Sequence, residues 1–276
     1  MGDLLGGDDG LPVEQVGEWV KEKHEYLRRY INISRAVRKK WLGPKGAGAT
    51  YIDLFCGPGR CQIRDTGEWV DGGVIAAWNM SVAGDAPFTQ IYVGDINPAC
   101  REAAVTRLRK LGAPVVELQG EAVQAAQEVV TKLHPDGLHF AFLDPFSLES
   151  LNFEIIKELS RFKRMDILVH VSQMDLQRNA VLNAVSDDSA FDKFAPGWRT
   201  AFPAVNPSGV IQREILEHWR NLVLGLGAWP SDHVQMIRAD KNQPLYRLLL
   251  ISKEKLANEF WSKASDISGQ GKLDFS

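Results

Sequence analysis

The stretch Tyr51-Ile52-Asp53-Leu54-Phe55-Cys56-Gly57-Pro58-Gly59 decides the fold. A short apolar run ends in an acid, and a turn with two glycines one residue apart follows it. Glycine lacks a Cβ, so such a turn can take positive φ and a ligand can approach its backbone. The stretch therefore predicts a buried parallel strand whose end meets a nucleotide-like cofactor. The structural alternative is an ordinary strand-to-helix turn.

Further apolar runs follow this strand, and each is separated from the next by a helical pattern. They lie at residues 90–94, 113–118, 138–143 and 166–171. Strands and helices thus alternate, which predicts a mostly parallel sheet with helices on both faces. Two more runs, 233–239 and 245–252, are joined by a turn too short for a crossover. We therefore expect them to form an antiparallel hairpin.

This layout resembles the class I S-adenosylmethionine methyltransferase fold. A dinucleotide dehydrogenase fits less well, because Gln62 stands where the G-x-G-x-x-G fingerprint needs its third glycine. We expect an α/β chain with a Rossmann-like class I methyltransferase sheet, a C-terminal antiparallel hairpin and an N-terminal helical extension. The resemblance implies S-adenosylmethionine as the cofactor, with S-adenosylhomocysteine as its product.

The two ends of the chain differ in composition from its middle. Residues 1–11 are rich in Gly and Asp and predict a disordered tail. Residues 12–46 predict a basic amphipathic helix, ended by a glycine-rich stretch. The methyltransferase-like α/β domain is expected at 47–264, with 174–207 as an insertion over the site. Residues 265–276 form a polar tail.

A long polar loop is expected between the glycine turn and the first crossover helix, at residues 60–73. A loop of this length at the carboxyl edge of a sheet is more typical of a binding loop or lid than of a simple connection.

Charge is unevenly distributed. The net charge is −3, so no overall field requires a polyanionic partner, but residues 21–41 concentrate Lys and Arg. One interpretation is a helix with a solvated basic face. The other is a contact with a nucleic-acid backbone or an acidic partner. The candidate contact residues are Arg28, Arg35, Arg38 and Lys39.

Three cysteines, an odd number without framework spacing, indicate a reducing compartment. The cysteines and histidines form no metal-ligand pattern. The sequence has no apolar run near the ~18 residues that span a bilayer, and no signal peptide. We expect a cytoplasmic protein with no metal site and no membrane contact.

The ends of successive strands carry groups suited to one nucleoside, because ligands in such sheets lie outside the carboxyl ends of the strands. Asp53 would reach the amino group of the cofactor, Asp95 would accept hydrogen bonds from the ribose hydroxyls, and Glu121-Ala122 would meet the adenine edge. The expected cofactor-binding residues are Asp53, Phe55, Gly57, Gly59, Asp95, Ile96, Glu121 and Ala122.

Each acid also has a structural interpretation. Asp53 can cap its own turn, Asp95 can cap the next helix, and Glu121 can sit favourably at a helix N-terminus. The joint placement of these acids at the ends of successive strands favours the cofactor site.

The fourth strand ends in Asp144-Pro145-Phe146, which are the candidate catalytic residues. This segment resembles the D-P-P-[YFW] element of amino-group methyltransferases that act on adenine or cytosine. Asp144 would accept a hydrogen bond from the target amine and Phe146 would stack on the base; the alternatives are a turn residue and a core side chain. The second proline is missing, which leaves the nucleobase target open. Cytosine-ring chemistry is rejected, because no cysteine follows this strand.

A closer resemblance covers most of the chain. Residues 12–41, Tyr51–Gly59, Phe140–Leu148 and Tyr246–Ser252 together resemble the three-Cys-motif partner protein family. Members of this family occur beside a three-cysteine protein that is itself similar to radical S-adenosylmethionine enzymes. The resemblance implies a methyltransferase-like domain and a three-Cys-motif protein as partner, but no settled substrate. Two functions follow: a methyltransferase acting on an amino group of a nucleic acid or modified nucleoside, or a non-catalytic cofactor-binding partner.

Overall fold

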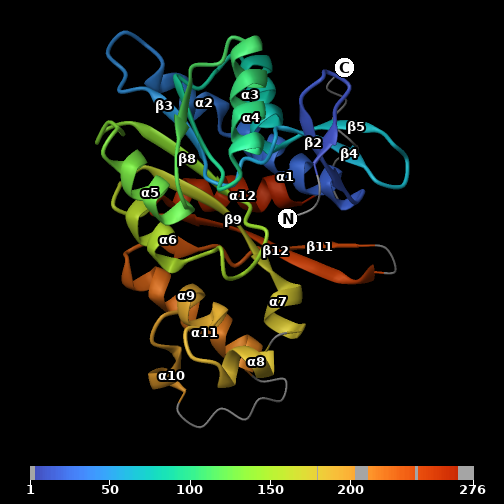
Figure 1. Cartoon of the computed structure of the whole chain (residues 1–276). Coiled ribbons are helices and arrows are strands. Elements are labelled where there is room, and N and C mark those ends of the chain that lie inside the picture. The colour runs from blue at the N-terminus through green and yellow to red at the C-terminus, as the bar shows by residue number, and fades with distance from the viewer. Residues whose placement is uncertain (1–3, 179, 203–210, 240–241, 267–276) are drawn as a thin grey trace.

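The computed structural model describes residues 4–178, 180–202, 211–239 and 242–266 (Figure 1). Its centre is a twisted sheet in which five parallel strands lie in the order β7-β6-β3-β8-β9. These strands are β3 (Ala49–Asp53), β6 (Gln90–Gly94), β7 (Val115–Leu118), β8 (Leu138–Leu143) and β9 (Met165–Ser172). The chain moves outward from β3 to β7 and then returns to the other side of β3, so the strand order reverses between β3 and β8.

The C-terminal strands extend this sheet beyond β9. Strand β12 (Pro244–Ser252) runs antiparallel to β9, with Tyr246 opposite Ser172 and Ser252 opposite Asp166. Strand β11 (Gln235–Arg238) and the short β10 (Trp229–Pro230) pair antiparallel with β12. The predicted fold class, parallel strands closed by an antiparallel hairpin, is therefore confirmed.

Helices cover both faces of the sheet, and an apolar core lies under each layer. One core is formed with α1 (Trp19–Ile33), α3 (Gly73–Ala83), α4 (Pro98–Lys110) and α12 (Lys255–Ser265). The other is formed with α5 (Ala122–Val130), α6 (Phe153–Leu159) and α11 (Ile211–Gly225). All five residues of β3 are buried between these layers, which fits a continuous apolar run in a central parallel strand.

The N-terminal extension differs from the prediction. Residues 4–11, expected to be disordered, contain β1 (Leu5–Gly6), which pairs with β2 (Pro12–Val16); residues 1–3 lie outside the described part. The helix expected over 12–46 is likewise shorter: α1 begins at Trp19 and is followed by α2 (Arg35–Arg38) and a 3₁₀ turn (Lys39–Trp41). Strand β2 forms because its backbone pairs with a segment far along the chain, and local periodicity does not report such pairing.

That distant segment is the region expected to be a loop. Residues 60–73 contain β4 (Arg60–Ile63) and β5 (Trp69–Asp71), which form a hairpin. Strand β4 pairs in parallel with β2, so a small second sheet has the order β1-β2-β4-β5. Buried Cys61 and Ile63 alternate with more exposed Arg60 and Gln62, as in a strand with one covered face.

The segment expected to be an insertion is helical where it is described. It contains α7 (Gln173–Arg178), α8 (Ala180–Val185), α9 (Ala190–Phe194) and α10 (Trp198–Ala201). Figure 1 shows these helices gathered with α11 into a lobe below the sheet. Residues 203–207 of this prediction, and 267–276 of the predicted polar tail, lie outside the described residues. Within the described ranges, no helix is both long enough and apolar enough to cross a membrane.

Candidate functional site

The two glycines of the turn after β3 have different roles. Both have positive φ, 54° at Gly57 and 79° at Gly59. A Cβ on Gly59 would lie 3.2 Å from Ile75 Cγ1 and 3.4 Å from Ala104 Cα, so Gly59 lets the turn pack against α3 and α4. A Cβ on Gly57 would meet only Glu14 Oε2, at 3.4 Å. Gly57 is therefore the position where a ligand can approach the backbone.

Asp95, at the end of β6, contacts this turn directly. Its Oδ2 accepts a hydrogen bond from the Gly57 N–H at 3.0 Å, and its Oδ1 accepts one from the Asn97 N–H at 2.8 Å. Burial raises the pKa of Asp95, and these two N–H groups oppose that shift. The cap of helix α4 is Asn97, whose side chain accepts from the Ala99 N–H. The carboxyl ends of β3 and β6, the first two predicted strands of the sheet, thus lie next to each other.

Asp53 does not face the turn's open side. Its side chain is 2% exposed, Oδ1 accepts from the Phe55 N–H at 3.1 Å, and Oδ2 accepts from the Tyr51 hydroxyl at 3.3 Å. Burial raises the pKa of Asp53 to about 8, with the charges of Asp144 and Asp95 adding to the shift and the Phe55 N–H opposing it. This is the capping role, and a buried, mostly neutral carboxyl is a poor partner for the cofactor's amino group.

Asp144 follows β8 and is held by two side chains that the sequence did not connect with it. Lys23 Nζ donates a hydrogen bond to Oδ2, and His170 Nδ1 lies 2.6 Å from Oδ1. Burial alone would raise the pKa of Asp144, but Lys23 and His170 outweigh it and hold that pKa well below its usual range. Burial lowers the pKa of His170 despite the nearby carboxylate. Asp144 therefore stays ionised although its side chain is mostly buried.

The two other candidate catalytic residues lie in the loop after β8. The Phe146 ring is 78% exposed, so it is not a core side chain. Pro145, between Asp144 and Phe146 in the sequence, is buried. The predicted insertion anchors this loop, since Asp175 of α7 accepts a hydrogen bond from the Leu148 N–H at 2.8 Å.

A pocket separates part of this loop from the insertion. Its volume is about 310 Å³, and Ser147, Glu149, Asp175 and residues 182–183 and 186–190 line it. Lys193 of α9 bridges to Glu149 at 2.6 Å across the same region. The described part of the insertion thus lies beside the loop that carries the candidate catalytic residues.

The remaining predicted cofactor residues are less closely joined to the glycine turn. Glu121 is exposed at the N-cap of α5, where its N–H donates to Gln124 Oε1 at 3.3 Å. Ala122 is partly buried beside it, Phe55 packs against the apolar core, and Ile96 is 58% exposed. Arg101 connects the ends of β6 and β7, because it donates to the Asp95 carbonyl and to Glu117.

Glu14 is the residue at this site that sequence reasoning missed entirely. It lies on β2, opposite Cys61 of β4, and its carboxylate faces Gly57. Burial and the charges of Asp95 and Asp144 raise its pKa. Glu14 and Lys23 both come from the N-terminal extension, and only long-range pairing places them here. His170 had one visible signal, since it is a histidine inside the apolar run of β9.

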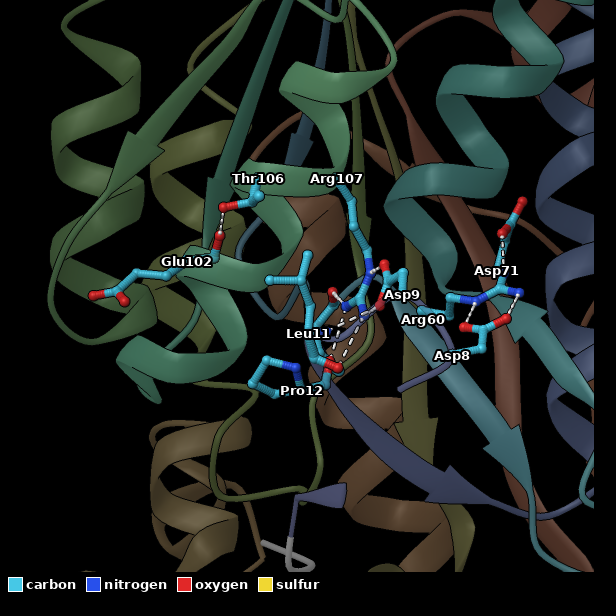
Figure 2. Close-up of polar contacts among 10 residues, drawn as sticks. Asp8, Asp9, Leu11, Pro12, Arg60, Asp71, Glu102, Thr106 and Arg107 are labelled. Atoms are coloured by element: carbon cyan, nitrogen blue, oxygen red, sulfur yellow. Dashed lines mark hydrogen bonds and ion pairs between the residues drawn. The ribbon is translucent and has the colours of Figure 1, made fainter. Parts of the chain in front are cut away.

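Two arginines tie the N-terminal segment to the domain, as Figure 2 shows. Arg107 of α4 holds the Asp9 carboxylate with two hydrogen bonds of 2.7 and 2.8 Å, and it also donates to the carbonyls of Pro12 and Pro58. Arg60 holds Asp8 with two hydrogen bonds of 2.7 Å each. Bidentate pairs of this kind fix geometry as well as charge. The segment before β2 is therefore held beside the glycine turn.

The cysteines have no nucleophilic character here. Cys56, Cys61 and Cys100 are all free and buried. Burial raises the pKa of Cys61 and of Cys100 to about 12 and raises that of Cys56 well above its usual range, so the thiols stay protonated. The described ranges contain no group of three or more His, Cys, Asp or Glu side chains that could hold a metal ion.

The predicted basic contact face needs one correction. Arg38 is 2% exposed and donates to the carbonyls of Ala86 and Ile31, so it supports the fold and cannot contact a partner. The chain leaves α1 before Arg38, and the single turn of α2 directs this side chain inward. Lys39 pairs with Asp85 at 2.9 Å on the surface. Arg28 pairs with Glu25, and exposed Arg35 donates to Asn32.

Comparisons with known proteins show similarity in fold alone. No family model and no curated protein matches the chain. Among solved structures, a Legionella pneumophila protein of family DUF519 is 12% identical over 83% of this chain and 85% of its own, with a TM-score of 0.47. The methyltransferase domain of bacterial CtHen1-C is 13% identical over 83% and 97%, with a TM-score of 0.42. The DszA carbon methyltransferase is 12% identical over 84% and 54%, with a TM-score of 0.47.

The chain has a Rossmann-like methyltransferase fold. The strand order β7-β6-β3-β8-β9, closed by antiparallel β12, carries this assignment.

Proposed function

We propose that this protein binds S-adenosylmethionine at the carboxyl edge of β3 and β6 and directs its methyl group to a substrate beside Asp144. The observation that carries the proposal is the 3.0 Å hydrogen bond from the Gly57 N–H to Asp95. It joins a glycine turn to an acidic strand end, next to the reversal of strand order between β3 and β8. Ligands of open α/β sheets bind at such reversals.

The residues present fit this cofactor. The charges of Asp95 and Asp144 raise the pKa of Glu14, and the charge of Lys23 opposes them. An acid-rich site favours a ligand with both a sulfonium and an ammonium group. Asp95 would hold the ribose hydroxyls, since a carboxylate can accept more than the two hydrogen bonds it now accepts. Glu121 and Ala122 would meet the adenine edge. When bound, S-adenosylmethionine supplies an activated methyl group.

The substrate class that fits best is an amino group of a nucleic acid or modified nucleoside. Asp144 is ionised, and each of its oxygens keeps a lone pair beyond the contacts with Lys23 and His170. It can therefore accept a hydrogen bond from an amine and orient its nitrogen. The exposed Phe146 ring, two residues further on, offers a surface on which a base can stack.

Calorimetric titration with S-adenosylhomocysteine tests cofactor binding. We expect affinity in the micromolar range, about 8 kcal/mol. No heat and no thermal shift at millimolar ligand would contradict the proposal. Methyl transfer to oligonucleotides is the second measurement: Asp144→Asn should abolish transfer while the affinity for S-adenosylhomocysteine stays near that of the wild type.

One observation favours a second candidate, a non-catalytic partner of a three-Cys-motif protein. Both oxygens of Asp144 already contact side chains that are at most 5% exposed, Lys23 and His170. This candidate also follows the resemblance to the three-Cys-motif partner family. It predicts co-purification with the three-Cys-motif protein, and Asp144→Asn should leave that complex intact. If the three-Cys-motif protein loses activity when this chain is removed, and this chain transfers no methyl group, the non-catalytic partner is favoured over the methyltransferase.

A further inference from the structure

The N-terminal strand places Glu14 over the open face of the glycine turn. The parallel register of β2 and β4 pairs Glu14 with Cys61, and Glu14 Oε2 would lie 3.4 Å from a Cβ on Gly57. Arg107 fixes this position, because one guanidinium donates to the Pro12 carbonyl at 2.9 Å and to the Pro58 carbonyl at 2.5 Å. Arg107 thus joins Pro12, two residues before Glu14, to Pro58, the residue after Gly57.

The Glu14 carboxylate has no strong partner in this position. Its hydrogen-bond contact is the Cys100 thiol, at 3.9 Å, and a thiol is a weak donor. Across the described ranges, no Lys, Arg or His forms an ion pair with Glu14; Lys23, the cation that influences it, bonds to Asp144. A partly buried carboxylate without a strong donor or a paired cation is costly. A ligand with a charged N–H group would satisfy it.

The other acids of the site are less suited to that ligand group. The Asp53 side chain caps its own turn by accepting a hydrogen bond from the Phe55 N–H, and Asp95 already accepts two backbone hydrogen bonds. The geometry points to Glu14 as the residue that accepts hydrogen bonds from the α-ammonium group of the cofactor's amino-acid part. This assignment rests on the proposed function. It makes the N-terminal extension a part of the cofactor site.

Two ligands separate this role from general effects on the site. S-adenosylhomocysteine carries the α-ammonium group, whereas 5′-methylthioadenosine has the same nucleoside without the amino-acid part. We expect Glu14→Gln to weaken S-adenosylhomocysteine binding about 10- to 100-fold in calorimetric titration, since a hydrogen bond between charged groups is lost. Affinity for 5′-methylthioadenosine should stay unchanged. Asp53→Asn is the matched control, and it should leave the ratio of the two affinities as in the wild type.

The outcomes are distinguishable. A wild-type protein that binds neither ligand overturns the proposed function and this assignment with it. A wild-type protein that binds both, with Glu14→Gln unaffected or equally weakened for both, overturns the Glu14 assignment alone. A loss confined to S-adenosylmethionine, with S-adenosylhomocysteine unaffected, would place Glu14 at the sulfonium and also overturn it. Tighter binding by Glu14→Gln would mean that the Glu14 charge opposes the ligand, and it would overturn the assignment. Thermal melting of each variant without ligand verifies the fold.

Discussion

Lys23 of α1 donates a hydrogen bond to Asp144, which lies 121 residues further along the chain at the end of β8. The side chain of Lys23 is 5% exposed and that of Asp144 is 19% exposed. Removing either partner leaves a charge in a setting poor in water, which costs far more than losing a surface pair. The N-terminal helix is thus tied to the candidate catalytic acid.

We expect Lys23→Met and Asp144→Asn each to lower the free energy of unfolding by about 3 kcal/mol. The double variant should lose clearly less than the sum, because neither charge is then left alone. Urea denaturation of all four proteins measures the coupling. Lys21→Met is the matched control, since Lys21 pairs with Glu68 on the surface, and it should leave stability nearly unchanged. Additive losses would contradict a direct pair.

The sequence predicted the parallel sheet and its closing hairpin because both depend on local patterns. The apolar runs of β3, β6 and β8 are short, continuous and separated by helical segments. They can be recognised without knowing which distant segments pair with them. The acids at their ends followed from the same topology. Asp95 came to the glycine turn as expected, since the ends of parallel neighbours must meet at one edge.

The N-terminal contribution could not be predicted in this way. Strand β2 pairs with β4, and Glu14 and Cys61 are partners only because of that register. A five-residue strand between a glycine-rich start and a helix has little local signal. The capping role of Asp53 was also open, because sequence shows that an acid ends a strand but not which way its side chain turns.

Asp95 should be the most sensitive position for cofactor binding. Its carboxylate is charged and already fixed by two backbone N–H groups, so it is pre-organised to accept the ribose hydroxyls. We expect Asp95→Ala to weaken S-adenosylhomocysteine binding at least ~100-fold, measured by calorimetry. Asp85→Ala, an acid on the surface, is the control and should bind as the wild type does. If Asp95→Ala keeps the wild-type affinity for S-adenosylhomocysteine, Asp95 does not hold the ribose hydroxyls.

Asp53 should give stability a pH dependence of its own. Burial raises its pKa in the folded protein to about 8, against 3.8 for the ordinary side chain. Between these values the folded protein holds one more proton than the unfolded chain, so the Asp53 contribution falls as pH rises from about 4 to about 8. Asp53→Asn lacks this loss and still accepts a hydrogen bond from Phe55. We expect it to exceed the wild type in stability by about 5 kcal/mol at pH 8, since each unit of pKa shift corresponds to about 1.4 kcal/mol.

The difference between these two proteins should shrink steadily as the pH falls from about 8 to below 3.8, where Asp53 becomes protonated in both the folded and the unfolded state. Chemical denaturation over this pH range measures it. A constant difference from pH 4 to pH 8 would show that Asp53 is ionised in the folded protein.

Arg107 should control the order of the N-terminal strand. Its side chain is 6% exposed, and its guanidinium holds Asp9 together with the carbonyls of Pro12 and Pro58. Arg107→Met leaves these acceptors unpaired, at a cost of about 2–3 kcal/mol. We expect amide hydrogens of residues 8–16 to exchange at least ~10-fold faster. Lys110→Met, exposed on the same helix, should leave exchange unchanged. Equal exchange in both variants would contradict the role of Arg107.

The basic face of the N-terminal helices gives a prediction that depends on salt. If Arg35 and Lys39 contact phosphates, the affinity for a fluorescent duplex oligonucleotide should fall steeply with salt concentration. Reversing both charges to Glu should lower the log–log salt slope by about 2, because each lost phosphate contact removes about 0.9. The pair Lys157→Glu on α6 and Arg161→Glu just after it is the control, since both side chains are exposed. Arg38 is left unchanged because it is buried. If the affinity does not depend on salt concentration, or if the control pair changes the slope equally, the basic face is only solvated and does not contact phosphates.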